Sequence, residues 1–169
     1  PPDERFIANN NIARLTLSPD GKSVAARFEN GVVRLWDFES GVEMGTFHGY
    51  SGATHSFAFS PSTPLLGMLH NVGDIYESFG KLKLFDLMSG DELPCPGQDS
   101  IDAHSIAISP DGKLVVLGQK DGSVSVWDAV ARTESTKLQA HTGDVCGLAF
   151  SPDGKLLASI SHAPATAFV

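Results

Sequence analysis

The sequence predicts an all-β protein built from about four repeated units, each with four antiparallel strands. Two markers carry this prediction: a turn sequence that recurs along the chain, and an aromatic–Asp pair that follows it. A third observation, the alternation of apolar runs and turn sequences between these markers, predicts strands instead of helices. The chain has 169 residues, which suits one domain better than two. We therefore expect 1–169 to form a single domain.

The first marker is the turn sequence SPDGK, which begins at Ser18, Ser109 and Ser151, with a degenerate copy at Ser60. The steps between these marker serines are 42, 49 and 42 residues, and the chain holds almost four such periods. Internal periods of this length are typical of solenoids and propellers. The predicted repeats are 1–42, 43–91, 92–133 and 134–169.

The second marker is an aromatic residue followed by Asp. It occurs as Trp36-Asp37, Phe85-Asp86 and Trp127-Asp128. The Trp pairs begin 18 residues after their marker serines, whereas the Phe pair begins 25 residues after its own. The second repeat therefore carries seven extra residues, which fall within Val72–Gly80.

Inside each unit, short apolar runs predict strands. A run such as Ile12–Ser18 leads into SPDG, which forms a turn because Pro fixes φ and Gly accepts positive φ. A second run follows, and Asn30-Gly31 or Asp121-Gly122 then predicts a two-residue hairpin. A third run alternates apolar and polar residues, and a weaker fourth strand comes after it. Four antiparallel strands in about 42 residues form one blade of a β-propeller.

These motifs, together with Ala140–Gly143 before the last inner strand, resemble the WD-repeat family over roughly residues 4–162. The resemblance implies WD-like blades, and within each blade a hydrogen-bonded set of His, Ser or Thr, Asp and Trp. That set is incomplete in every unit, so we expect blade stability to depend on apolar packing between sheets. The expected structural residues are Trp36, Asp37, Phe85, Asp86, Asp121, Trp127, Asp128 and His141.

Four blades are fewer than the seven or eight that are typical of the WD-repeat family. The sequence leaves open a small closed ring, a piece of a larger propeller, and two chains that form one ring. Glu4–Ile7 is predicted as an outer strand and Ala165–Val169 as a third strand, so the first could complete the last blade. An incomplete ring exposes apolar sheet faces, which predicts a partner such as a second copy in a homodimer.

Composition argues against several classes of function. The 20 acidic residues outnumber the 12 basic ones, and a net charge of −8 disfavours binding to nucleic acid or anionic membranes. No apolar stretch is long enough to span a bilayer. Two cysteines, Cys95 and Cys146, suit a reducing compartment, so we expect a cytoplasmic protein.

The sequence holds no recognisable catalytic motif, neither GxSxG nor HExxH nor a phosphate-binding glycine loop. We therefore predict a non-catalytic protein without a cofactor. One coincidence concerns the position five residues before each marker serine, which carries Ala13, His55, His104 and Cys146. A metal site needs convergent geometry that spacing alone does not supply, so we predict none. A metal- or small-molecule-binding propeller stays an alternative, as does a regulatory propeller of a larger enzyme.

The predicted function is a protein-interaction module or scaffold. The extra segment Val72–Gly80 places two aromatic residues next to two acids, as recognition loops do, although a tolerated surface insertion is the simpler alternative. We expect it to share one face of the disc with acidic residues that include Glu29, Asp102 and Asp121, with Lys120 as the main base. This face predicts a protein or peptide partner, and a basic one. The predicted contact residues are Tyr50, Asp74, Tyr76, Glu77, Phe79, Asp99 and Asp144.

Overall fold

The computed structural model describes residues 11–18, 20–48, 54–60, 63–73, 78–94, 101–162 and 165–168. Throughout these ranges the regular secondary structure consists of β-strands joined by turns, so the all-β prediction is confirmed. No helix in the described part of the chain is long and apolar enough to cross a bilayer.

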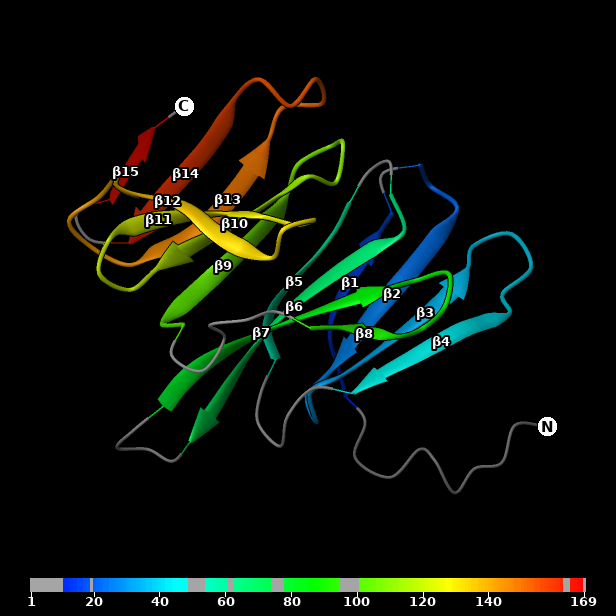
Figure 1. The fold of residues 1–169 in the computed structure, drawn as a ribbon. Coiled ribbons are helices and arrows are strands. Elements are labelled where there is room, and N and C mark those ends of the chain that lie inside the picture. Colours follow the sequence, from blue (N-terminus) through cyan, green and yellow to red (C-terminus); the bar gives the residue numbers. More distant parts are fainter. Residues whose placement is uncertain are drawn as a thin grey trace.

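The strands form four antiparallel sheets, each built from consecutive strands (Figure 1). Sheet 1 contains β1 (Ile12–Leu17), β2 (Ser23–Phe28), β3 (Val32–Asp37) and β4 (Glu43–His48). Sheet 2 contains β5 (Thr54–Phe59), β6 (Leu65–Gly73), β7 (Ser78–Asp86) and β8 (Glu92–Leu93). Sheet 3 contains β9 (Ala103–Ile108), β10 (Leu114–Gln119), β11 (Ser123–Asp128) and β12 (Thr133–Gln139). Sheet 4 contains β13 (Val145–Phe150), β14 (Leu157–His162) and β15 (Ala165–Phe168).

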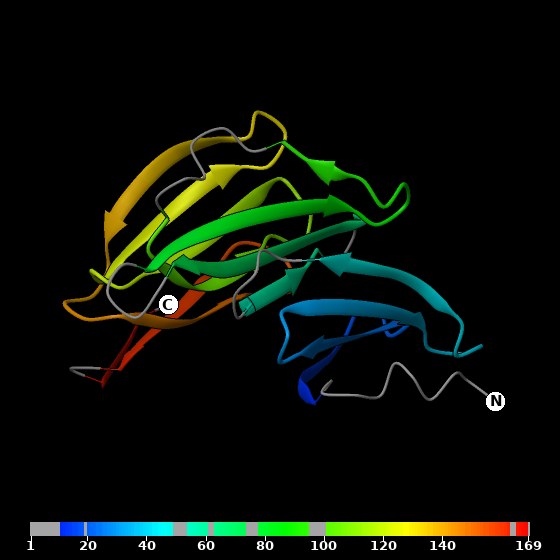
Figure 2. The same ribbon diagram turned by 90° about the horizontal axis from the view of Figure 1, so that it is seen from below.

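These sheets are the predicted blades. Figures 1 and 2 show them following one another in chain order, with sheet 1 and sheet 4 at the two ends of the array. Among the described residues sheet 4 has three strands, and its last strand, β15, lies where the sequence predicts a third strand. The segment that was expected to add an outer strand, Glu4–Ile7, lies outside the described residues.

The SPDGK turns are held by one hydrogen-bond pattern. In the first turn, Ser18 Oγ donates to Asp20 Oδ1 at 2.6 Å, and the same carboxylate oxygen accepts the backbone N–H of Lys22. The backbone N–H of Ser23 in turn donates to Ser18 Oγ at 2.9 Å. Ser109 and Ser151 repeat the pattern in the third and fourth blades. The glycine of each turn has a φ near 70°, which explains why glycine is required.

The Asp of each aromatic–Asp pair caps the turn that follows the third strand. Asp37 accepts hydrogen bonds from the backbone N–H and the hydroxyl of Ser40. Asp86 and Asp128 each accept two backbone N–H groups in the same way. These carboxylates therefore stabilise the turns that follow the third strands.

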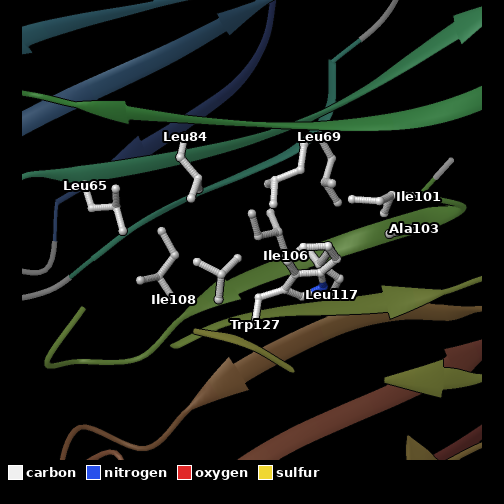
Figure 3. Packing of buried hydrophobic residues seen from close by; sticks show 11 residues of the cluster. Leu65, Leu69, Leu84, Ile101, Ala103, Ile106, Ile108, Leu117 and Trp127 are labelled. Carbon is white, nitrogen blue, oxygen red and sulfur yellow. The ribbon is translucent and has the colours of Figure 1, made fainter. Parts of the chain in front are cut away.

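The core lies between the sheets. Between sheets 2 and 3, leucines of β6 and β7 pack on isoleucines of β9 and on Trp127 (Figure 3). A second cluster joins sheet 1 to sheet 2, where Leu35 and Phe47 meet Phe57 and Phe85. A third cluster joins Val116 and Val124 of sheet 3 to Val145 of sheet 4. Stability therefore comes largely from apolar area buried between neighbouring sheets.

The three marker aromatics occupy equivalent positions but differ in burial. Trp127 and Phe85 are 7% and 5% exposed, and each packs toward the preceding sheet. Trp36 is only partly buried, because in sheet 1 the equivalent side carries no described sheet. His141 Nε2 lies 2.8 Å from the Ser159 hydroxyl, and this buried pair links the approach to β13 with β14.

Candidate interaction surfaces

The most distinctive element is the hairpin of β6 and β7. Each of these strands has nine residues, whereas the second and third strands of sheets 1 and 3 have six. The additional backbone pairs are Asn71 with Gly80, Val72 with Phe79, and Gly73 with Ser78. The expectation that Val72–Gly80 is entirely a loop was therefore wrong, because its ends are strands. Valine and phenylalanine favour extended backbone, so the extra residues lengthen the ladder.

The base of this long hairpin is fixed to the next blade. The backbone N–H of Ile101 donates to the carbonyl oxygen of Gly80 at 3.0 Å. A Cβ atom on Gly80 would overlap the carbonyl oxygen of Ile101, so the two backbones approach as closely as glycine permits. Ile101 itself is buried in the cluster between sheets 2 and 3. The hairpin is therefore joined to the inter-sheet core at its base.

The structure describes only part of the predicted contact set. Tyr50, Asp74, Tyr76, Glu77 and Asp99 lie outside the described residues. The backbone of Phe79 is placed in β7, opposite Val72. Asp144 is described in full, just before β13.

The described acids on this face carry their own partners. Asp102 pairs with Lys120 at 2.7 Å, and Asp121 pairs with Lys137 at 3.2 Å. Asp144 Oδ2 lies 2.7 Å from His104 Nδ1, across the junction of sheets 3 and 4. Lys120 was expected on this face as its main base, but none of the three pairs was predicted from the sequence. Lys137 reaches Asp121 only through the register of β11 and β12, which no local motif reveals.

The Asp121 carboxylate also closes the turn before β11. The hydroxyl and the backbone N–H of Ser123 both donate to Asp121 Oδ1. The hydroxyl bond is the main cause that lowers the pKa of Asp121 below its usual range, and Lys137 adds to the effect. Asp121 is therefore ionised at neutral pH and committed to contacts within the chain.

The position five residues before each marker serine, where His55, His104 and Cys146 occur, is explained by the backbone register. In every sheet the residue five before the marker serine is the extra residue of a β-bulge, skipped in the register with the second strand. Among these residues, His104 faces Asp144, while Cys146 Sγ lies 3.6 Å from the carbonyl oxygen of Ile160. In the described part of the chain, no group of three or more His, Cys, Asp or Glu side chains is placed to hold a metal. A repeated bulge therefore accounts for the spacing.

The inner strands line a cavity of about 690 Å³ that sequence reasoning did not predict. Its wall combines hydroxyl groups, such as Ser56 and Ser105, with apolar side chains such as Ile106 and Phe150. Ser105 Oγ is already engaged, donating to the carbonyl oxygen of Val145 at 2.7 Å. The described lining offers no pair of acids and no metal-ligand cluster, so its geometry indicates no particular chemistry.

Apolar side chains are exposed at both ends of the array. In sheet 1, Ile12, Leu15 and Leu17 are 55%, 60% and 54% exposed. In sheet 4, Ile160 is 49% exposed. These side chains lie in the first and the last of the described sheets, and others of similar exposure, such as Met88 and Val130, lie in turns between strands.

Four-stranded antiparallel sheets that pack face to face in chain order define a β-propeller protein. The family description "WD domain, G-beta repeat" matches residues 94–128 and 132–162. A chain in a crystal structure of the Mitotic Checkpoint Complex superposes with a TM-score of 0.71 at 20% identity. That match covers 91% of this chain and 45% of the other. The chain therefore carries WD repeats and has the fold of a β-propeller.

Relatives at the sequence level are longer proteins. The chain is 28% identical to Periodic tryptophan protein 2 homolog of Dictyostelium discoideum, covering 89% of this chain and 16% of that protein. It is 31% identical to Autophagy-related protein 16 of Arabidopsis thaliana, covering 90% of this chain and 30% of that protein. It is 26% identical to Target of rapamycin complex subunit wat1 of Schizosaccharomyces pombe, covering 90% of this chain and 48% of that protein. The chain thus spans between about a sixth and a half of the length of these relatives.

Proposed function

We propose that this chain is a non-catalytic interaction scaffold that binds a protein or peptide through the face bearing the β6–β7 hairpin. The observation that carries the proposal is the extra length of this hairpin. Sheets 1 and 3 form complete four-stranded blades with six-residue second and third strands, so the blade does not need the additional pairs. An anchored extension beyond the needs of the fold is a natural contact element.

The relatives support a role in complexes. Wat1 is described as a subunit of a target of rapamycin complex, and a Danio rerio relative, 28% identical, is described as guanine nucleotide-binding protein subunit beta-5b. The matching solved structure is that of a mitotic checkpoint complex. Proteins of this fold therefore work as parts of assemblies, and we infer the same kind of role for this chain.

The partner that we propose is basic. The net charge of −8 favours a cationic protein or peptide and disfavours nucleic acid and anionic membranes. Because Asp102, Asp121 and Asp144 already have partners within the chain, the acids of the hairpin tip are the better candidates for contact. We also infer a cytoplasmic location, on the basis of the two cysteines.

The test replaces Asp74–Glu77 with Gly-Ser-Gly-Ser and leaves the strand pairs of Ser78–Gly80 intact. We expect this variant to unfold at the same denaturant concentration as the parent chain. We expect it to capture less of the partner from source lysate than the parent chain does. A matched control is Val130→Ser, because Val130 is 80% exposed in the turn after β11, at the end of sheet 3 that carries the SPDGK turn. If the tip variant captures the same partners as the parent, the insertion is only tolerated and the proposal fails.

A further inference from the structure

A groove of about 360 Å³ lies between sheets 1 and 2, at the end of the sheets that carries the SPDGK turns. Its lining includes Leu35 of sheet 1 and Phe59 of sheet 2, which both belong to the apolar packing that joins these two sheets. The turns that follow β3 and β7 lie on the same side of the array (Figure 1) and contribute to it. The groove lies at the opposite end of sheet 2 from the tip of the β6–β7 hairpin, so it is separate from the surface proposed above.

The groove occurs where the turn of the second blade departs from SPDGK. In the next two blades the turn glycine packs on the preceding blade, because a Cβ on Gly112 would lie 2.1 Å from Thr63 Oγ1 and one on Gly154 would lie 3.3 Å from Pro110 Cδ. In the second blade the position of this glycine carries Thr63. The backbone N–H of Thr63 donates to Ser60 Oγ, whereas the turn glycines donate to the backbone carbonyl of their marker serine. The second turn therefore has a different shape from the turns that pack closely at the other two contacts.

Two of the chain's three methionines line this groove, and both are exposed. Met88 is 82% exposed in the turn after β7, and Met44 of β4 is 54% exposed. Met68, by contrast, is 0% exposed in the cluster between the same two sheets. The turn position of Met88 carries Glu39 in sheet 1, so the fold does not require an apolar side chain there. Methionine is flexible and polarisable, which suits a surface that binds apolar side chains.

The charges beside the methionines are mainly negative. Asp20 and Asp37 line the groove, and a serine hydroxyl is the main cause that lowers the pKa of each carboxyl group. Both are therefore ionised at neutral pH. The hydrogen bonds that the described chain makes to these two carboxylates all use Oδ1, so Oδ2 of each can accept from a ligand. Lys22 is the base in the described lining.

We propose that this groove binds a short segment of a partner protein in which a large apolar residue is flanked by Arg or Lys. The apolar side chain lies between Met44 and Met88, and a flanking base pairs with Asp20 or Asp37. The same carboxylates disfavour nucleic acid and anionic membranes, whose phosphates they repel. A protein segment supplies both the apolar and the cationic group that this groove complements.

The test uses the methionine methyl groups of the full 169-residue chain as NMR probes. The chain labelled with ¹³C at these methyl groups reports on Met44 and Met88 at the groove, and on Met68 in the core as an internal reference. The titrants are three synthetic peptides of equal length. In the first, Arg and Lys flank a central Leu. In the second, Glu flanks the Leu on both sides, and in the third, Arg and Lys flank a central Gly.

With the Arg-Leu-Lys peptide, we expect the signals of Met44 and Met88 to shift and to saturate at millimolar peptide, while the signal of Met68 keeps its position. The other two peptides should bind about tenfold more weakly or less, since one lacks the positive charge and the other lacks the apolar side chain. Unshifted signals of Met44 and Met88 at millimolar Arg-Leu-Lys peptide, or equal binding of the acidic peptide, overturn the proposal.

A matched pair of variants locates the binding. Met88→Gln keeps the length of the side chain and removes its apolar end, so it should weaken binding of the Arg-Leu-Lys peptide about fivefold, read from the signal of Met44. Val130→Gln is the control, because Val130 is 80% exposed at the equivalent turn position of sheet 3. It should bind the peptide as the parent chain does. Equal affinities of the two variants would show that the peptide binds elsewhere and would refute the proposal.

Discussion

At the scale of single residues, equivalent positions in the repeat contribute unequally to stability. Trp127 and Trp36 follow the same marker at the same distance, yet only Trp127 is enclosed between two described sheets. Its indole packs among leucines of sheet 2 and isoleucines of sheet 3 (Figure 3). The burial of each aromatic side chain, and not its place in the motif, therefore determines how much it contributes to the free energy of unfolding.

The first prediction compares these two residues. Trp127→Ala should lower the free energy of unfolding by about 3–5 kcal/mol, the usual cost of truncating a buried aromatic. Trp36→Ala should cost clearly less, because Trp36 is partly exposed in the single chain. Denaturant unfolding at low protein concentration measures both. Equal losses would show that Trp36 is as well covered in solution as Trp127.

The second prediction concerns the SPDGK carboxylates. The hydroxyl of Ser109 is the main cause that lowers the pKa of Asp111, and the same arrangement lowers the pKa values of Asp20 and Asp153. A pKa lowered by folding means that the stabilisation is fully present above the ordinary aspartate value of about 3.9. It is lost as the pH falls through the lower, folded value.

Asp111→Asn should therefore destabilise the chain at pH 7 and make less difference near pH 3. Unfolding measured at both pH values checks this, with Lys113→Gln as a control that keeps the Ser109–Asp111 bond. A stability difference between parent and Asp111→Asn that is the same at both pH values would contradict the assigned role of the carboxylate.

At the scale of elements, the long hairpin depends on one close backbone contact. Gly80 lies where its carbonyl accepts the N–H of Ile101, and a side chain there has no room. Gly147 offers a matched comparison, because a Cβ there would meet only the side chain of Ile160, at 2.9 Å. A flexible exposed side chain can move, whereas a backbone carbonyl within the inter-sheet core cannot.

The third prediction follows from this difference. Gly80→Ala should destabilise the chain by about 1–3 kcal/mol, as overpacking in a dense core does. Gly147→Ala should cost less than half of that. Equilibrium unfolding gives both values, and amide exchange at Ile101 shows whether the bond to Gly80 is the one that weakens. Equal losses in the free energy of unfolding for the two variants would mean that the backbone at Ile101 moves aside at little cost.

The repeat made the elements predictable, because marker spacing and turn chemistry are local properties. SPDG, Asn-Gly and Asp-Gly placed the turns, and the runs between them placed the strands. The hairpin extension was not predicted, since the pairing of Val72 with Phe79 depends on the register of two strands and not on a local motif. The partners of Asp121 and Asp144 were missed for the same reason. Contacts between strands and sheets are set by register and packing, which short motifs do not encode.

At the scale of the whole molecule, the described sheets form a row in which each sheet packs on its neighbours. In such proteins stability is close to a sum of unit and interface terms, so units with one neighbour open most easily. Sheets 2 and 3 have neighbours on both faces, whereas sheets 1 and 4 expose one face each. Amide exchange should therefore be slowest in β6 and β10 and faster in β2 and β14.

The fourth prediction tests this gradient in the isolated chain. Hydrogen exchange measured strand by strand should show that β2 and β14 open at a lower free-energy cost than β10, because each end sheet packs on one described neighbour. If β14 exchanges as slowly as β10, contacts between neighbouring sheets do not set the order in which the sheets open.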